Sequence, residues 1–73
     1  MTYYLSEVQN NGSHRKAIIL KANTLTSAKR EATKKSCFYD TVLKIGTELD
    51  NDFLDDDSLV CLKNINGKWI SPK

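Results

Sequence analysis

This sequence of 73 residues contains little cysteine and histidine and no long apolar run. No apolar run approaches the roughly 20 residues that a transmembrane helix needs. The first residues, MTYYLSEVQ, contain neither the basic region nor the apolar region of a signal peptide. We therefore expect a protein that does not contact membranes and that stays in the cytoplasm where it is made.

Cysteine and histidine are scarce, since the chain has only Cys37, Cys61 and His14. Without a CxxC pair, these three residues do not supply the tetrahedral ligand set of a structural zinc site. In a reducing cytoplasm both cysteines are expected to be free thiols that pack as small apolar side chains. His14 lies beside a predicted turn, and no sequence pattern assigns it a nucleophile. We therefore predict no metal, no cofactor and no catalytic residue, and hence no enzyme.

Negative charge is scarce in the first part of the chain and concentrated in the second. Residues 1–44 carry eight Lys and Arg against three acids, whereas residues 45–73 carry three Lys against six acids, so the net charges are +5 and −3. The acids cluster between Glu48 and Asp57, but the glycine and the final glutamate of an EF-hand calcium loop are missing. We expect residues 50–58 to form a solvated loop that keeps an edge strand soluble.

Alternating apolar and polar residues predict a sheet interrupted by one helical segment at 24–36. The predicted strands cover residues 3–9, 15–22, 41–47, 59–63 and 68–70. In the second strand, Ile18, Leu20 and Ala22 should face the core, and Ile19 should face the other side. The sequence therefore predicts a single domain over residues 1–73 with an α+β fold of order ββαβββ. An antiparallel five-stranded sheet would carry one helix packed on one face.

The predicted helix combines a narrow apolar stripe with a cationic remainder. Leu25, Ala28 and Ala32 recur at helical spacing, and because the alanines are small they should lie close against a sheet. A threonine, Thr24 or Thr26, can cap the first turn. The side chains that should point away from the stripe are Lys29, Arg30, Thr33 and Lys34.

Four cations, Lys29, Arg30, Lys34 and Lys35, fall within seven residues of this helix. Arg30 and Lys34 repel each other at a spacing of i, i+4, and the opposite charges of Glu31 and Lys35 offset only part of that cost. A cation cluster that local helix energetics disfavours indicates an anionic partner, either nucleic acid or an acidic patch on a protein. An ordinary solvated helix face is the alternative interpretation.

The aromatic residues either build the core or stack on nucleic-acid bases. In a domain this small most of them must build the core, so we assign Trp69 and Phe38 to it. Tyr3 and Tyr4, on the first predicted strand, are weaker core candidates. The sequence contains no RNP motif, GXXG loop or P-loop.

Two segments, YYLSEVQN and TLTSAKREATKKSCFYDTV, resemble a phage-encoded type I-F anti-CRISPR family, the ninth named of its subtype. AKR alone is a weak signal, whereas the ordered set over residues 3–45 is specific. The tail resembles the family through a final Gly-Lys and Trp. The matching residues are Glu7-Val8-Gln9-Asn10, Ala28-Lys29-Arg30, Ala32, Lys34, Cys37-Phe38 and Thr41-Val42.

The resemblance implies a five-stranded antiparallel sheet with one helix, and binding to the backbone subunits of a guide-RNA surveillance (Csy) complex. Such binding would block pairing of target DNA with the guide, and the bound complex would favour non-specific duplex DNA. The family's contacts carry over to Lys29, Arg30 and Lys34, and a glutamine of the family is replaced by Ser36 here. The predicted partner-binding residues are Lys29, Arg30, Lys34, Lys35, Ser36 and Tyr3.

On this interpretation the protein is a monomer in the cytoplasm of the bacterial host, with weak non-specific affinity of its own for duplex DNA. Two other functions stay open. One is a stand-alone nucleic-acid-binding module, with the helix on phosphates and the tyrosines on bases. The other is a regulator that binds a different acidic protein.

Overall fold

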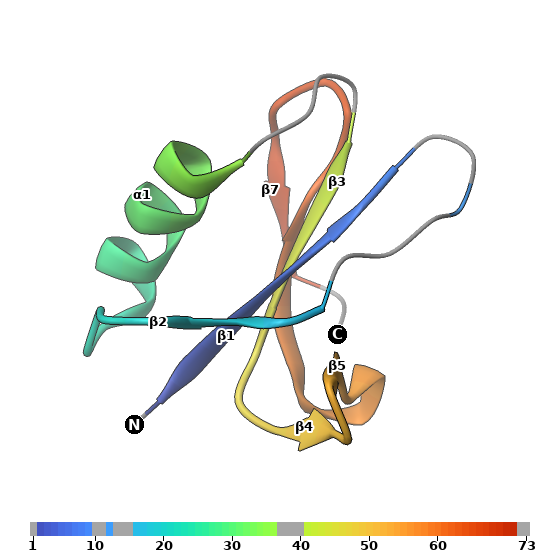
Figure 1. The fold of residues 1–73 in the computed structure, drawn as a ribbon. Helices are drawn as coiled ribbons and strands as arrows, with labels where there is room; N and C mark the ends of the chain where they lie inside the picture. Colours follow the sequence, from blue (N-terminus) through green and yellow to red (C-terminus); the bar gives the residue numbers. More distant parts are fainter. Residues whose placement is uncertain (1, 10–11, 13–15, 37–40, 72–73) are drawn as a thin grey trace.

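The computed structural model describes residues 2–9, 12, 16–36 and 41–71, and it has the predicted α+β architecture (Figure 1). Helix α1 lies against one face of a five-stranded antiparallel sheet, whose strand order is β2-β1-β3-β6-β7. The predicted fold class is therefore confirmed. The elements of this layer pair are β1 (Tyr3–Val8), β2 (Ile18–Leu20), α1 (Leu25–Lys35), β3 (Val42–Gly46), β6 (Leu59–Lys63) and β7 (Trp69–Ile70).

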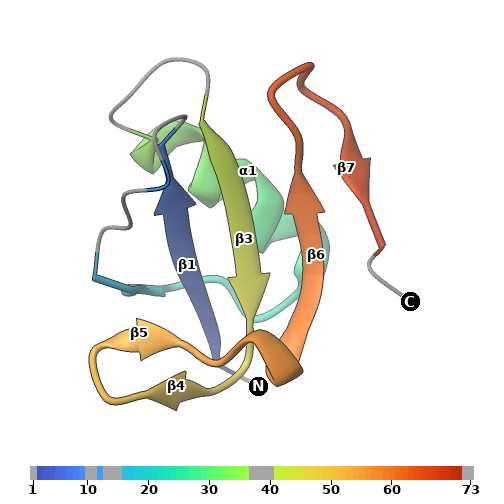
Figure 2. The same cartoon turned by 90° about the vertical axis from the view of Figure 1, so that its right-hand side faces the viewer.

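The prediction of a solvated loop at residues 50–58 is wrong, because most of this segment forms secondary structure. Strands β4 (Leu49–Asp50) and β5 (Phe53–Leu54) form a second, two-stranded sheet, and a 3-10 turn follows at Asp56–Ser58. The two-residue connection begins with Asn51 at φ 58°, a left-handed conformation that asparagine tolerates in tight hairpin turns. We call residues 48–58 the acidic hairpin. It lies at the lower end of the sheet in Figure 2.

Gly46 allows the acidic hairpin to fold back on the sheet. A Cβ atom at this position would lie 2.8 Å from both Leu54 Cδ1 and Ser58 Oγ, which is too close for any side chain. Ser58 Oγ in turn accepts hydrogen bonds from the backbone N–H groups of Thr47 (3.2 Å) and Glu48 (3.0 Å). The close approach at Gly46 and the hydroxyl of Ser58 together fix the place of the hairpin.

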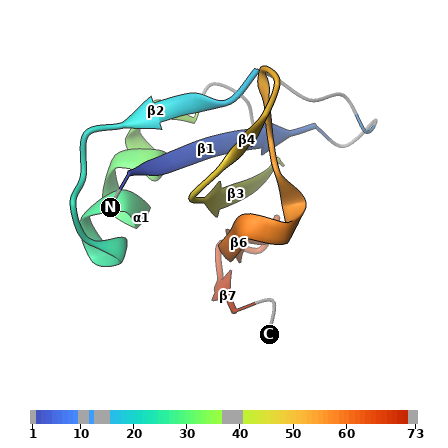
Figure 3. The same ribbon diagram turned by 90° about the horizontal axis from the view of Figure 1, so that it is seen from below.

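The core lies between α1 and the face of the sheet that α1 covers. In Figure 2, α1 lies behind the sheet. Ala28 and Ala32 are fully buried, and their small size lets the helix lie close to the sheet, as predicted. Leu5 and Ile45 are the large apolar side chains beneath them. Fully burying such a side chain contributes about 1.5–3 kcal/mol. Figure 3 shows α1 on one side of the sheet and the 3-10 turn of the acidic hairpin toward the other.

Strand β2 is shorter than the predicted 15–22, although its faces are as predicted. Leu20 is buried, Ile18 and Ala22 pack against the core, and Ile19 is 62% exposed on the other side. The strand ends at Leu20 because the next two backbone N–H groups donate to a helical carboxylate, described below, and not to a neighbouring strand. Residue 15, the first of the predicted range, lies outside the described residues.

The sparse residues of the sequence fall in different parts of the molecule. Cys61 is a buried free thiol, as predicted, whereas Cys37, Phe38 and His14 lie outside the described residues. Trp69 is half-buried and packs against the core cluster. Within the described ranges, no helix is long and apolar enough to cross a membrane.

Candidate binding surface

Helix α1 begins and ends close to the predicted bounds of 24–36. Thr24 is its N-cap, and the Thr24 hydroxyl accepts a hydrogen bond from the backbone N–H of Ser27 at 3.3 Å. The last turn contains Lys34 and Lys35, whose positive charges interact favourably with the negative end of the helix dipole. The helix therefore carries its highest positive charge at its C-terminal end, where cations stabilise it most.

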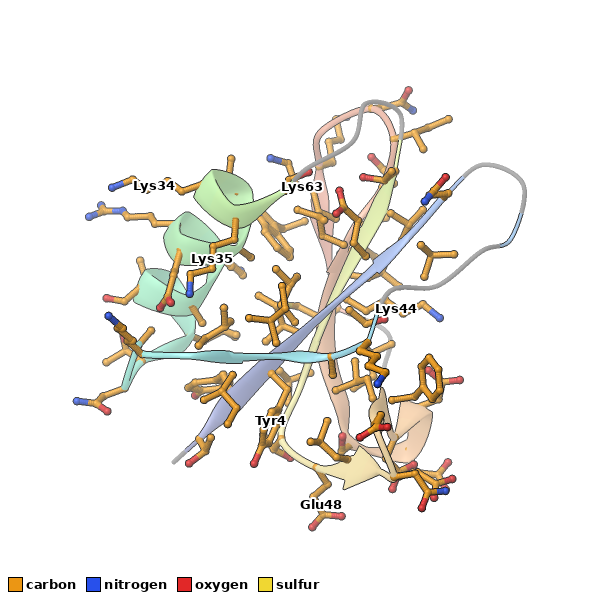
Figure 4. All side chains as sticks on the ribbon, in the orientation of Figure 1. Tyr4, Lys34, Lys35, Lys44, Glu48 and Lys63 are labelled. Atoms are coloured by element: carbon orange, nitrogen blue, oxygen red, sulfur yellow. The ribbon has the colours of Figure 1, made fainter. Side chains whose placement is uncertain are left out.

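Arg30 and Lys34 are exposed on the side of α1 that faces away from the sheet. They lie one turn apart, and Figure 4 shows Lys34 extending into solvent from the last turn. Together with Lys29 we call them the helical cations. An exposed guanidinium with an ammonium one turn away can contact two anionic groups on a partner, and the guanidinium can bind a carboxylate or phosphate with two hydrogen bonds.

Lys29 does not point away from the sheet, contrary to the prediction. Its ammonium lies over the indole ring of Trp69, 5.8 Å from the ring centroid. Lys63, on β6, places its ammonium at the same distance from the same ring. The Lys63 ammonium also donates to Thr33 Oγ1 (3.3 Å), and the Thr33 hydroxyl donates to the backbone oxygen of Lys29 (3.0 Å). The positive surface thus continues from the helix onto β6.

The charge of Lys29 also affects the pKa of the Cys61 thiol. Burial raises the pKa of Cys61, and the nearby charge of Lys29 acts in the opposite direction. The burial effect is the larger of the two, so this thiol stays protonated and unreactive near neutral pH.

Glu31 joins α1 to the segment that precedes it, a role that the sequence did not indicate. Its Oε1 accepts from the backbone N–H groups of Lys21 (2.8 Å) and Ala22 (3.0 Å), and its Oε2 accepts from Lys21 at 3.0 Å. The predicted pair with Lys35 is present, with 3.2 Å between Lys35 Nζ and Glu31 Oε2. The backbone hydrogen bond from Lys21 lowers the pKa of Glu31 most, and the partial burial of the carboxyl opposes it. Of the four predicted cations, Lys35 is therefore turned toward a carboxylate of its own helix.

This network predicts a pH-dependent contribution of Glu31 to stability. Because the folded-state pKa lies below the ordinary value of 4.5, the carboxylate stabilises the fold fully above that value. The contribution should disappear as the pH falls through the lower, folded-state pKa. We expect Glu31→Gln to be less stable than the parent protein at pH 7, and the difference to shrink below pH 4. Urea unfolding of both proteins between pH 2.5 and 7 measures it, and a difference independent of pH would contradict the assignment.

Ser36, a predicted partner-binding residue, points toward the sheet. It is the C-cap of α1, and its hydroxyl donates to Glu7 Oε2 at 2.7 Å. Thr41, just before β3, donates its hydroxyl to the same oxygen at 2.9 Å. Glu7 is only 2% exposed, so this carboxylate joins the end of the helix to the start of β3 inside the molecule. Its place on the buried face follows from the alternation of Tyr3, Leu5 and Glu7, which was the one signal in the sequence.

Tyr3, the last predicted partner-binding residue, is not brought together with the helical cations. It is 9% exposed and belongs to the core cluster beneath α1. The candidate surface that the structure assembles therefore differs from the predicted set. Its charged residues are Lys29, Arg30, Lys34 and Lys63. Thr33 of α1 and Trp69 of β7 contact these lysines where the helix meets the sheet.

The acidic hairpin lies apart from this surface. Surface ion pairs involve two of its acids: Lys16 Nζ is 3.6 Å from Asp52 Oδ2, and Lys44 Nζ is 3.6 Å from Asp56 Oδ1. Such pairs contribute little to stability. Figure 4 shows Glu48 at the opposite end of the molecule from the helix. In the part of the chain that the structure describes, no group of three His, Cys, Asp or Glu residues is placed to hold a metal ion.

A solved structure titled AcrIF9 is similar to this chain over its whole length. The TM-score is 0.71 and the sequence identity is 32%, and the match covers 100% of this chain and 87% of the solved one. Neither the models of protein families nor the curated proteins give a match. The similarity therefore includes both the helix and the sheet on which it lies.

Proposed function

Because the chain belongs to the AcrIF9 family of type I-F anti-CRISPR proteins, we propose that it binds the backbone subunits of a type I-F surveillance complex and blocks hybridisation of target DNA. The family membership rests on the full-length similarity to AcrIF9. Anti-CRISPR function against type I-F follows from it. On this proposal the protein acts as a monomer in the cytoplasm of the bacterial host.

The observation that supports this proposal is the arrangement of positive charge on α1. Arg30 and Lys34 are exposed and one turn apart, and the Lys29 and Lys63 ammonium groups both lie over the Trp69 ring at the border of helix and sheet. Charged hydrogen bonds from such groups contribute about 1.5–3 kcal/mol each. A small protein with several cations on one surface, two of them held over Trp69, can therefore bind tightly over a modest area.

Inhibition by this surface requires no chemistry. In guide-RNA systems the target sequence is recognised by base pairing along a positively charged channel, and the protein holds the heteroduplex by its backbone. A protein that occupies this channel prevents pairing. Because the channel itself is positive, the helical cations must meet acidic side chains of the backbone subunits or exposed phosphates of the guide. Both are anionic acceptors with the geometry that Arg30 can bind through two hydrogen bonds.

A competition experiment tests the proposal. A purified type I-F surveillance complex is incubated with the protein, and pairing with a labelled target duplex is then followed by gel shift and by footprinting of the displaced strand. We expect loss of strand displacement in proportion to the protein bound. Full strand displacement by a complex saturated with the protein would contradict the proposal, and so would a failure of the protein to bind the complex in the absence of DNA.

The alternative, a stand-alone nucleic-acid-binding module, makes a different prediction for the isolated protein. Four clustered cations allow only a few phosphate contacts, so we expect weak binding to duplex DNA with a slope of log K against log salt of roughly −3. Binding should be undetectable above about 0.1 M salt, because each contact depends on counterion release. A salt titration with duplex and single strands measures it. Sub-micromolar binding at physiological salt would favour the alternative and contradict the proposed function.

A further inference from the structure

Trp69 occupies an unusual place, with two lysine ammonium groups over one indole ring. Lys29 comes from α1 and Lys63 from β6, and each ammonium lies 5.8 Å from the ring centroid. Thr33 completes the group, because its hydroxyl accepts from Lys63 and donates to the backbone oxygen of Lys29. The contacts therefore form a closed circuit of four residues that joins the helix to the sheet.

The turn between β6 and β7 fixes the ring in this place. Trp69 lies opposite Lys63 in the antiparallel pair of β6 and β7. The Asn64 side chain accepts from the backbone N–H groups of Asn66 (3.0 Å) and Lys68 (3.1 Å), and Gly67 adopts φ 86°. Because the backbone is held by these bonds, the indole does not depend on a partner for its position.

Each ammonium lies within the range at which an aromatic ring attracts a cation. The attraction comes from the negative face of the ring, and among the aromatic side chains tryptophan attracts cations most strongly. Both lysines and the ring are half-buried, which strengthens the attraction relative to a fully exposed site. Lysine side chains held in this way lose less conformational freedom when a partner binds.

We propose that Trp69 is a positioning residue of the binding surface: its indole holds the Lys29 and Lys63 ammonium groups in place for an anionic partner. The inference rests on the proposed function for its partner, and it adds Lys63 and Trp69 to a surface that the sequence placed on the helix alone. With the ammonium groups over the ring, Trp69 acts through the two lysines and does not itself offer a stacking face.

The first test uses the free protein and needs no partner. A ring current displaces the NMR signals of protons that lie over an aromatic ring, so the ε-methylene protons of Lys29 and Lys63 should resonate upfield of those of the other lysines. Trp69→Leu should abolish the displacement and Trp69→Phe should keep part of it. The absence of any displacement in the parent protein would overturn the inference.

The second test is a double-mutant cycle on binding to a purified type I-F surveillance complex. We expect Trp69→Leu to weaken binding about three- to tenfold, and Trp69→Phe to weaken it less. In a Lys29→Ala/Lys63→Ala background, Trp69→Leu should change the affinity by less than about twofold. An equal loss in both backgrounds would show that the indole acts on its own or through the fold, and the positioning role would be overturned.

Failure of the proposed function has a different signature. If Lys29→Ala/Lys63→Ala leaves the affinity for the complex unchanged, these lysines do not bind the partner, and the role of Trp69 in binding is excluded. Circular dichroism and thermal unfolding of each variant guard against misfolding. Trp69→Phe keeps an aromatic ring in the same apolar site, so it separates loss of the cation contact from loss of packing.

Discussion

Replacing Lys29, Arg30 and Lys34 together by alanine is expected to weaken binding to a type I-F surveillance complex by about a thousandfold or more. Each charged hydrogen bond contributes about 1.5–3 kcal/mol, and three at the low end give about 4.5 kcal/mol, where about 1.4 kcal/mol is tenfold. The variant should stay folded, because the exposed Arg30 and Lys34 side chains carry no core contact and Lys29→Ala removes only a half-buried contact with Trp69. Biolayer interferometry on an immobilised complex measures the affinity.

A matched control removes the same net charge elsewhere. Lys16, Lys21 and Lys68 are exposed and lie outside α1, so their joint replacement by alanine should change the affinity by less than about threefold at physiological salt. Equal losses in both triple variants would mean that net charge, and not the helix, determines binding. If the variant that lacks Lys29, Arg30 and Lys34 kept its full affinity, the assignment of the helical cations as the binding site would be refuted.

Among the single variants, we expect Arg30→Ala to reduce the affinity more than Lys29→Ala. A guanidinium binds a carboxylate or phosphate through two parallel hydrogen bonds, which an ammonium on a flexible stem does not replace. The structure adds a second reason. Arg30 projects from the helix into solvent, whereas Lys29 lies over the Trp69 ring. Lys63 lies over the same ring, so it still provides a positive charge there when Lys29 is replaced.

The elements that sequence reasoning predicted best are those with a strong local period. The helix follows from Leu25, Ala28 and Ala32 at helical spacing, and the faces of β2 follow from Ile18 and Leu20 with Ile19 between them. In both cases one face is buried and the other is not, so the pattern of apolar residues records the contact with the core. The five-stranded sheet was predicted for the same reason.

The acidic hairpin was missed because its signals are non-local or easily mistaken. Six acids within ten residues resemble a solvated loop, and strands of two residues are too short to show alternation. What orders them is the packing of Leu54 and Ser58 against Gly46, which are contacts between residues that are not neighbours in the sequence. The available signal was Asn51 between Leu49 and the apolar pair Phe53-Leu54, because asparagine is typical of tight hairpin turns.

The binding surface was predicted in part. The helical cations could be found from charge clustering alone, because a helix brings residues three and four apart together. Lys63 and Trp69 could not, because they join Lys29 only through the pairing of β6 with β7 and the packing of both against α1. That Ser36 and Tyr3 point toward the interior likewise depends on tertiary contacts. Ser36 contacts Glu7, and Tyr3 packs in the core cluster.

The second large effect concerns stability: Glu7→Ala should lower the free energy of unfolding by about 2–4 kcal/mol. The Ser36 and Thr41 hydroxyls, 2.7 and 2.9 Å from Glu7 Oε2, would lose this acceptor in a buried place, and a cavity would form. A small domain has a modest free energy of unfolding, so this loss could leave much of the protein unfolded. Urea unfolding followed by the fluorescence of the single tryptophan measures it.

Glu7→Gln separates the hydrogen bonds from the charge. Its amide oxygen can accept from both hydroxyls, so we expect a loss of about 1 kcal/mol, clearly smaller than that of alanine. Glu48→Ala, which removes an exposed carboxylate from the acidic hairpin, should change stability by less than about 0.5 kcal/mol. A Glu7→Ala variant as stable as Glu48→Ala would mean that the end of α1 is held to the sheet by apolar packing alone. A Glu7→Gln variant as unstable as Glu7→Ala would mean that the negative charge, and not the acceptor geometry, is what Ser36 and Thr41 require.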